Sequence, residues 1–344
     1  MMHRIQYFDF LRTIAIVAVI TIHVTASHVS SLSHSSDFYF SLLLNSLSRW
    51  GVPIFIMISG SLLLSKESNK DSIKLLYKKN IIHLTRVFLI WALIYLCWGN
   101  IFEYYNGNSL SMQNYFKHGF HLWFLPMLIG LYISSPFLKI IAKDKNTAAY
   151  FITICLVFSF LFPNIVKILE IYSSTSKQIS LLYNYLSYFN KNLFLNFGGF
   201  CCYYILGYYL NFHLKREINK KVLITLGALS IACIYGLTLI SNYNKSNFDT
   251  YFLGNYNFFT ILLSICVFLL AKKIKESKMM TVKNLSSLVI EIYLTHLIVL
   301  ESLSFCRIQI PYYIQIPLYI IIVFTVCIIF SKILHLLGIN KYIF

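Results

Sequence analysis

Long apolar segments recur along the whole chain, and they restrict its fold more than any other feature of the sequence. Each is long enough for a helix rising ~1.5 Å per residue to cross roughly 30 Å of hydrocarbon. The segments lie near residues 8–29, 41–64, 81–98, 121–141, 149–169, 193–212, 221–241, 255–271, 285–305 and 313–336. The sequence therefore predicts an all-α integral membrane protein, a bundle of about ten transmembrane helices forming a single domain over residues 1–344.

The composition and the remaining segments agree with this prediction. Of the 344 residues, 58% are hydrophobic and 12% charged, whereas soluble domains carry roughly twice that charged fraction. The first apolar run is too long for a signal-peptide core and has no small-residue cleavage site, which indicates a retained span. The eight cysteines show no CxxC pair, which favours buried thiols over a zinc or disulfide framework. Residues 170–192 are polar and are predicted to be the longest loop.

The formal net charge of +17 would suggest a nucleic-acid partner in a soluble protein, but here the basic residues follow the membrane topology. Of the 29 Lys and Arg residues, about 20 fall in one set of alternate loops. The opposite loops hold Lys117, Lys167, Lys177, Lys191, Lys245 and Arg307, while Arg12, Arg49 and Arg86 lie inside spans. This asymmetry predicts both termini in the cytoplasm, membrane lipid as the surroundings, and no nucleic-acid partner.

The first span carries two ionisable residues, Arg12 near its cytoplasmic end and His23 in its outer half. Ionisable groups at membrane depth are costly and usually face a cavity or a partner. Eleven residues correspond to three helical turns plus about 20°, so the two residues share a face and lie ~16.5 Å apart along the axis. Either residue alone can be a snorkelling anchor or a hydrogen-bonded interior group. Their shared face favours a joint role in lining a cavity.

A second group of candidates lies at the predicted cytoplasmic boundary, where nucleotide-bearing donors occur. Arg86, Glu291 and Arg12 lie about one turn inside it, and Lys78, Lys79 and His83 lie at or just before it. Guanidinium groups bind phosphates in a planar fork, which suits a cofactor rich in phosphate. The structural alternative is that Arg12 or Arg86 simply pairs with Glu291.

The predicted outer half of the membrane contains Arg49, His121, Trp123 and His23, and His296 lies near mid-depth. Histidine is the natural general base near neutral pH. The sequence has no GxSxG elbow, no HExxH motif and no carboxylate cluster suited to a metal, so direct transfer without a metal is favoured. His118 falls in an outer loop and can be an ordinary exposed residue, so it is not a candidate.

Four motifs carry a family resemblance. They are Phe8-Asp9-Phe10-Leu11-Arg12-Thr13-Ile14-Ala15 followed by His23; Ser48-Arg49-Trp50-Gly51-Val52-Pro53 running on to Gly60; His121-Leu122-Trp123-Phe124-Leu125 running on to Pro136; and Ile292-Tyr293-Leu294-Thr295-His296. In this order they resemble the membrane-bound acyltransferase-3 family, specifically the branch that O-acetylates sugars of bacterial surface polysaccharides. The resemblance covers nearly the whole chain.

The resemblance implies a ten-helix core in the bacterial cytoplasmic membrane. It also implies acetyl-CoA as the acyl donor and a hydroxyl of a cell-surface or lipid-linked glycan as the acceptor. It matches His23 to the essential first-helix histidine, Arg12 to its paired arginine, and Arg86 to the arginine of the third-helix basic motif. Where the family often has Arg-x-x-Arg, this chain has His83 before Arg86, and Lys78 or Lys79 can substitute in binding the CoA phosphates.

The remaining candidates are assigned to the acceptor. Arg49, His121 or His296 can bind the developing oxyanion or position the sugar, and Trp123 can stack on a sugar ring. Glu291 is also assigned to the acceptor. Two other functions stay open from the residues alone. One is a polytopic transporter or flippase for a glycan or another polar substrate, although no inverted repeat is evident. The other is a family member that uses another donor, such as succinyl-CoA.

Overall fold

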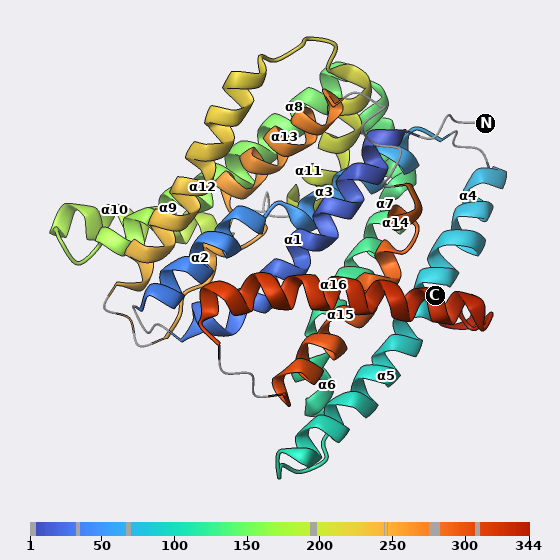
Figure 1. The fold of residues 1–344 in the computed structure, drawn as a ribbon. Coiled ribbons are helices and arrows are strands. Elements are labelled where there is room, and N and C mark those ends of the chain that lie inside the picture. The colour runs from blue at the N-terminus through green and yellow to red at the C-terminus, as the bar shows by residue number, and fades with distance from the viewer. Residues whose placement is uncertain are drawn as a thin grey trace. The chain divides into compact units, whose positions relative to one another are not determined.

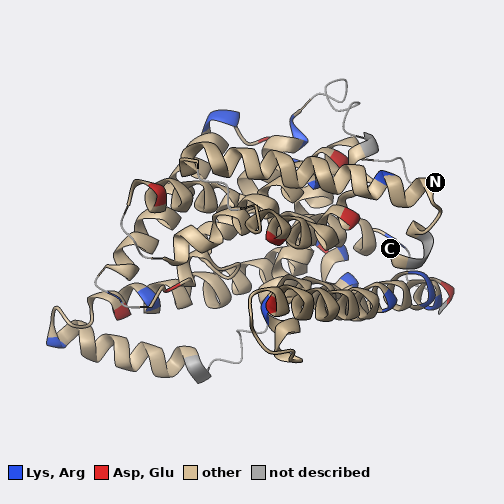
Figure 2. Ribbon diagram, turned by 60° about the horizontal axis from the view of Figure 1, so that its bottom comes forward, with Lys and Arg blue, Asp and Glu red and all other residues tan. Residues whose placement is uncertain are grey.

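All the regular secondary structure is helical in the part of the chain that a computed structural model describes (Figure 1). That part comprises residues 5–31, 35–66, 70–192, 198–243, 245, 247–274, 283–306 and 310–344. The long helices are tan over most of their length in Figure 2, which marks uncharged residues, as helices that cross a bilayer require. The predicted all-α fold is confirmed.

Eight helical segments are long and apolar enough to cross a membrane, within the described residues. They are Gln6–Ser30, Ser36–Leu64, Asp71–Tyr105, Phe120–Lys143, Lys145–Tyr172, Lys220–Asn242, Tyr251–Lys272 and Tyr312–Leu336. The chain is therefore a polytopic membrane protein. Of the predicted span 193–212, residues 193–197 lie outside the described residues, and 199–212 are helical. The predicted span 285–305 contains the helix Val289–Ser304. The count of ten crossings and the cytoplasmic termini stay predictions.

One segment was wrongly predicted as a loop. Residues 170–192 contain the end of one helix and all of α10 (Lys177–Asn192), which packs against α9 (Phe162–Tyr172). The partly buried residues of α10 include Ile179, Tyr183 and Leu186, which recur with helical spacing. Mean hydropathy over this segment is low, because polar residues surround the apolar stripe. Hydropathy therefore identifies transmembrane helices but misses an amphipathic helix of this kind.

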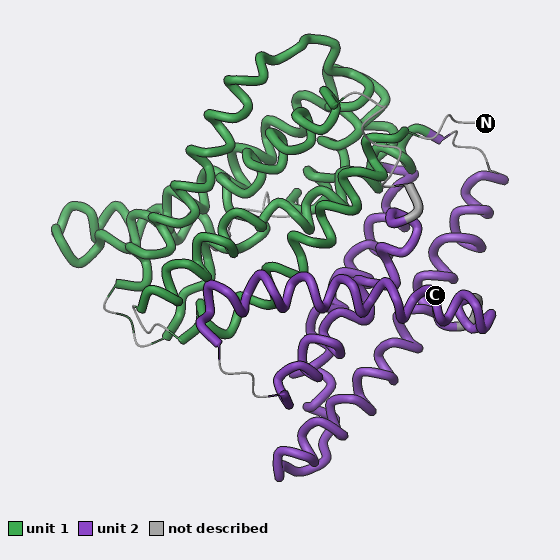
Figure 3. The backbone as a smooth tube through the Cα atoms, viewed as in Figure 1, with its two compact units in different colours: residues 1–65, 138–282 green, residues 66–137, 283–344 purple. Residues whose placement is uncertain are grey.

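The backbone divides into two compact units (Figure 3). Unit 1 comprises residues 1–65 and 138–282, and unit 2 comprises residues 66–137 and 283–344. Besides α9 and α10, unit 1 contains α1 (Gln6–Ser30), α2 (Ser36–Ser48), α3 (Gly51–Leu64), α8 (Lys145–Cys155), η3 (Leu156–Leu161), α11 (Gly199–Tyr208), η5 (Tyr209–His213), α12 (Lys220–Asn242), η6 (Tyr251–Leu253) and α13 (Phe258–Lys272).

Helix α11 lies in the interior of unit 1 and packs closely on α3. A Cβ atom added at Gly60 would lie 1.9 Å from the carbonyl oxygen of Tyr204, and one added at Gly207 would lie 2.0 Å from that of Met57. The Ser61 hydroxyl donates to the Gly207 carbonyl at 2.6 Å. Small residues allow two membrane helices to approach until their backbones touch, which is what this pair does.

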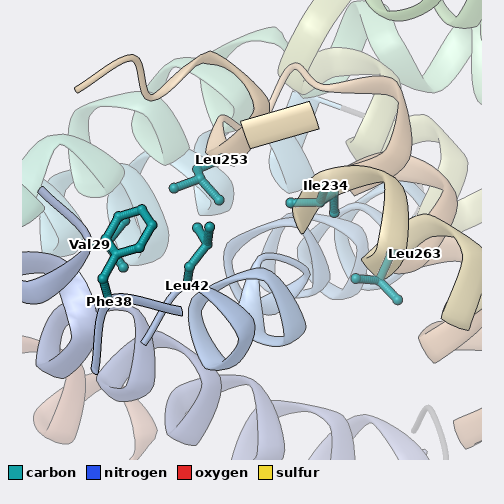
Figure 4. Close-up of a cluster of buried hydrophobic side chains, with 6 residues drawn as sticks. All are labelled: Val29, Phe38, Leu42, Ile234, Leu253 and Leu263. Carbon is teal, nitrogen blue, oxygen red and sulfur yellow. The ribbon is translucent and has the colours of Figure 1, made fainter. Parts of the chain in front are cut away.

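Another part of unit 1 is held together by apolar side chains from five elements. Val29 of α1, Phe38 and Leu42 of α2, Leu253 of η6, Ile234 of α12 and Leu263 of α13 form one buried cluster (Figure 4). The cluster joins the C-terminal end of α1, the helix of His23, to α2, the helix that ends beside Arg49. It therefore fixes the elements that carry two of the predicted site residues.

Unit 2 contains the elements that carry the remaining predicted site residues. They are α4 (Lys70–Leu76), η1 (Tyr77–Ile81), α5 (Ile82–Tyr105), α6 (Gln113–His118), η2 (Phe120–Trp123), most of α7 (Phe124–Lys143), α14 (Lys283–Ser286), α15 (Val289–Ser304), α16 (Tyr312–Leu336) and α17 (Asn340–Ile343). Two hydrogen bonds from α5 hold the C-terminal half in place. Trp91 donates to the Ile343 carbonyl at 3.1 Å, and Tyr95 donates to the Leu294 carbonyl at 2.8 Å.

Candidate active site

The ten predicted site residues divide between the two units. Unit 1 contains Arg12, His23 and Arg49, and unit 2 contains Lys78, Lys79, Arg86, His121, Trp123, Glu291 and His296. Within each unit the structure shows which of them share a neighbourhood.

Helix α1 is continuous from Gln6 to Ser30, as the shared face of Arg12 and His23 requires. Both side chains are half-buried. Asp9 approaches Arg12, with Oδ1 and Nη1 3.4 Å apart, and is itself buried. The sequence reasoning did not use Asp9, although its spacing of three residues from Arg12 is a signal for contact on a helix.

Arg49, at the end of α2, is linked to the turn of α1 that contains His23. Its Nη2 atom donates to Oδ1 of the fully buried Asn45. The Asn45 amide then donates to the Thr25 hydroxyl at 2.8 Å and to the Ile22 carbonyl at 3.2 Å. The Arg49 Nε atom is enclosed and has no hydrogen-bond partner among the described residues. An enclosed donor of this kind can bind an anionic group that arrives with a substrate.

A tyrosine-lined cavity of about 620 Å³ opens elsewhere in unit 1. Three tyrosines from separate segments line it, Tyr39 of α2, Tyr172 of α9 and Tyr243 after α12, and the charged residues are Glu170 and Lys245. Its volume is typical of small-molecule sites, in which aromatic walls carry a few polar groups.

The two charged residues belong to a chain of ion pairs. The Lys167 ammonium lies 3.0 Å from Glu170 and 2.8 Å from Asp249, and Lys245 lies 3.0 Å from the same Asp249 carboxylate. Burial raises the pKa of Asp249, but the hydrogen bonds from Lys167, from the Tyr251 backbone and from Lys245 outweigh it and hold the pKa at about 2. These pairs restrict the side chains of Glu170 and Lys245 beside the cavity.

In unit 2 the structure brings His121 and His296 together. Their ring centroids are 5.2 Å apart in an edge-to-face arrangement, and the two side chains are 2% and 0% exposed. Tyr293 donates to the His121 carbonyl, and His296 Nδ1 lies 2.6 Å from the Tyr293 carbonyl. Because a carbonyl can only accept, Nδ1 of His296 carries a proton, and Nε2 is the basic nitrogen of the neutral ring. Trp123 is more exposed, as a residue at the rim of a site would be.

Glu291 is paired with a histidine. Its Oε1 atom lies 2.7 Å from His335 Nε2 of α16, whose other nitrogen lies 3.0 Å from the Asn340 amide. The carboxylate is buried, and its Oε2 atom has no hydrogen-bond partner among the described residues. His335 is a partner of Glu291 that the sequence reasoning missed, and the alternative in which Arg12 or Arg86 pairs with Glu291 stays a prediction.

The comparison with protein families decides the identity of the chain. Residues 5–332 match the family described as an acyltransferase domain, the acyltransferase-3 type. The chain belongs to the acyltransferase-3 family. Neither a search of curated proteins nor a search of solved structures found a match.

Membership of the acyltransferase-3 family places the chain among membrane-bound transferases that use an acyl donor. The residues that match the basic motif of the third helix in this family are Arg86 and its neighbours. Arg86 is exposed, and its Nη2 atom lies 3.3 Å from His83 Nδ1. Lys78 and Lys79 are exposed on η1, about two turns before Arg86. The histidine that departs from the Arg-x-x-Arg pattern therefore still lies beside the arginine.

His118 of this acyltransferase-3 protein is not an ordinary exposed loop residue. It is buried between two carboxylates, with Nε2 3.0 Å from Glu103 and Nδ1 2.9 Å from Glu301. Lys117 also contacts Glu103, and Trp98 donates to Glu301 at 2.6 Å. The imidazole ring therefore bridges the two carboxylates, with one ring nitrogen toward each. The cluster ties α6, which leads directly into His121, to α5 and α15.

We expect His118→Leu to lower the free energy of unfolding by roughly 3 kcal/mol or more, because it leaves two largely buried carboxylates without their shared partner. The measurement is thermal unfolding of the purified protein in detergent. His83→Leu is the matched control, since that imidazole is only half-buried, and its transition should move much less. Equal transition temperatures for the two variants would contradict a structural role for the cluster.

Proposed function

We propose that this protein moves an acetyl group from cytoplasmic acetyl-CoA to a hydroxyl of a cell-surface or lipid-linked glycan, in the bacterial cytoplasmic membrane. The observation that carries the proposal is the Arg49 guanidinium, with its enclosed Nε atom, linked through Asn45 to the turn of α1 that contains His23. A general base and an oxyanion donor on neighbouring elements are what acyl transfer from a thioester requires.

The reaction follows from these two groups. His23 takes the proton of the sugar hydroxyl as the hydroxyl oxygen attacks the thioester carbonyl, and Arg49 donates to the oxyanion that forms. Collapse of this intermediate breaks the carbon–sulfur bond. The CoA thiolate leaves and takes up the proton held by His23, so the products are the acetyl ester and CoA.

The donor is assigned to the basic residues of the predicted cytoplasmic side. Arg12, Arg86 and either Lys78 or Lys79 are proposed to bind the phosphates of CoA. Arginine offers a planar pair of donors to a phosphate, and lysine a mobile charge. The ~16.5 Å between Arg12 and His23 along α1 is comparable to an extended pantetheine arm, which would carry the thioester from one to the other.

Two features support a polyhydroxylated acceptor. The tyrosine-lined cavity of unit 1 combines three aromatic faces with a carboxylate and an ammonium, and its lysine belongs to a loop that is predicted to lie outside the cell. The second is the cluster of His121, His296 and the exposed Trp123 in unit 2, which we assign to positioning the acceptor sugar, with Glu291 in support.

The test is transfer of labelled acetyl from acetyl-CoA to surface glycans by the purified protein in liposomes, with succinyl-CoA as a parallel donor. We expect ester formation to fall roughly 10²–10³-fold in Arg49→Gln, because an oxyanion donor is lost. Arg49→Lys keeps the charge and should retain more activity. Glycan movement across the liposome membrane without any acyl ester formed would show that the protein is a transporter instead.

A further inference from the structure

A second cavity of unit 1, of about 720 Å³, has a strongly basic wall. Four cations line it, namely Lys215, Arg216, Lys272 and Lys273. Among the described residues, Glu217 is the one carboxylate that lines it, and it pairs with Lys273 at 3.3 Å. We call this cavity the basic pocket. None of its cations was selected from the sequence, where they look like ordinary loop charges of the predicted cytoplasmic side.

The backbone around the basic pocket holds these charges in place. The π-helical turn η5 ends at His213, whose Nε2 atom lies 2.8 Å from the Ala142 carbonyl, and Leu214 continues in an extended conformation. The chain stays non-helical until Asn219, which caps α12 by accepting from the Lys221 N–H at 2.8 Å. Lys215 and Arg216 therefore lie on a short segment anchored at both ends.

Further hydrogen bonds fix the opposite wall. At the end of α13, the Lys272 ammonium donates to the carbonyls of Leu210 and Asn211 at 2.9 and 3.2 Å. The Asn211 side chain, which also lines the pocket, accepts from the Tyr7 hydroxyl of α1 at 2.5 Å. The pocket is thus connected to α1, the helix that carries Arg12 and His23.

Charge and polarity together define what the basic pocket can bind. Like charges brought together repel even in water, so a cluster of four cations favours an anion. The floor is apolar, because Leu223 and Leu269 are buried there, and Phe212 lies at the exposed edge. Arginine and lysine bind phosphate, and an apolar floor suits a ring or chain attached to it.

We propose that the basic pocket binds the phosphate groups of an amphiphilic ligand, with Lys215 and Arg216 as the main phosphate contacts. Two sources have this chemistry. One is the 3′-phosphate at the nucleotide end of CoA, beyond the phosphates assigned to Arg12 and Arg86, which rests on the function proposed above. The other is the headgroup of an anionic phospholipid. Both sources require the phosphate, and they differ in what is attached to it.

The test measures binding alone, on the full-length protein in nanodiscs of phosphatidylcholine. CoA and 3′-dephospho-CoA are titrated into the wild type, into Lys215→Ala/Arg216→Ala, and into the matched control Lys220→Ala/Lys221→Ala. The control removes two neighbouring charges that do not line the pocket. We expect the first double variant to weaken CoA binding at least tenfold relative to the control, because two charge-assisted contacts are lost.

A second arm separates the two sources. The same three proteins are placed in nanodiscs with phosphatidylglycerol, and retained lipid is measured by native mass spectrometry. If Lys215→Ala/Arg216→Ala retains less phosphatidylglycerol than the control but binds CoA equally well, the ligand of the basic pocket is the lipid. If neither CoA binding nor lipid retention differs between the two double variants, the proposal is overturned. Both arms measure binding and not turnover. The binding result can therefore be interpreted even if the protein transfers no acetyl group, and the transfer assay can be interpreted even if the basic pocket binds neither ligand.

Discussion

Replacing His23 with Ala is expected to reduce acetyl transfer by roughly 10²–10⁴-fold, the usual contribution of general acid–base catalysis. The side chain is half-buried on α1, and Asn45 bonds to the turn that contains it. Without an imidazole, the acceptor hydroxyl must lose its proton to water, which slows attack on the thioester. The measurement is the rate of ester formation at saturating acetyl-CoA.

Binding of acetyl-CoA is the control that gives this result its meaning. If the phosphates are bound at the predicted cytoplasmic end, His23→Ala should bind acetyl-CoA as the wild type does. Near-normal transfer in the variant would remove His23 from the mechanism and make His121 or His296 the base. The enclosed His121–His296 pair offers a basic nitrogen for that role.

The second large effect concerns folding. Gly60→Val should prevent the protein from accumulating as a folded species, because even the first added carbon would lie 1.9 Å from the backbone oxygen of Tyr204. Backbone cannot move aside as a side-chain tip can, so α3 and α11 must separate. We expect a cost of roughly 3 kcal/mol or more, at the upper end of what overpacking causes. The measurement is the yield of monodisperse protein by size-exclusion chromatography.

A matched glycine substitution tests whether position or residue type matters. Gly236 lies within α12, and a Cβ atom added there meets nothing within 4 Å. Gly236→Val should therefore fold as well as the wild type, since valine is a better helix former than glycine. A normal yield of Gly60→Val would mean that the close approach of α3 and α11 is not required by the native state.

The division into two units bears on how the catalytic groups are supplied. The predicted base, its arginine neighbour Arg49 and the basic pocket all belong to unit 1. Arg86, the lysines of η1 and the His121–His296 pair belong to unit 2. Loss of donor binding in Arg86→Ala, in which His23 and Arg49 are unchanged, would show that unit 2 takes part.

Several features of this protein were predictable because they depend on local sequence alone. Apolar runs identified the membrane helices, since a helix must be about 20 apolar residues long to cross a bilayer. The shared face of Arg12 and His23 followed from helical periodicity, and the continuous α1 bears out its premise. The failure at residues 170–192 was also local, because the apolar stripe of α10 is diluted by tyrosine, asparagine and serine.

Contacts between distant segments could not be predicted in this way. His118 looked like a loop residue because Glu301, one of its two carboxylate partners, lies 183 positions away in the chain. The sequence determined that this is an apolar, polytopic helical protein with ionisable residues at membrane depth, because burial in lipid acts on each segment separately. Only the tertiary structure decided that Arg49 is linked through Asn45 to the turn of His23, that three tyrosines line one cavity and that Lys215 and Lys272 line another. Those pairings depend on how helices pack, and packing is settled by shape and hydrogen bonding between residues far apart in the chain.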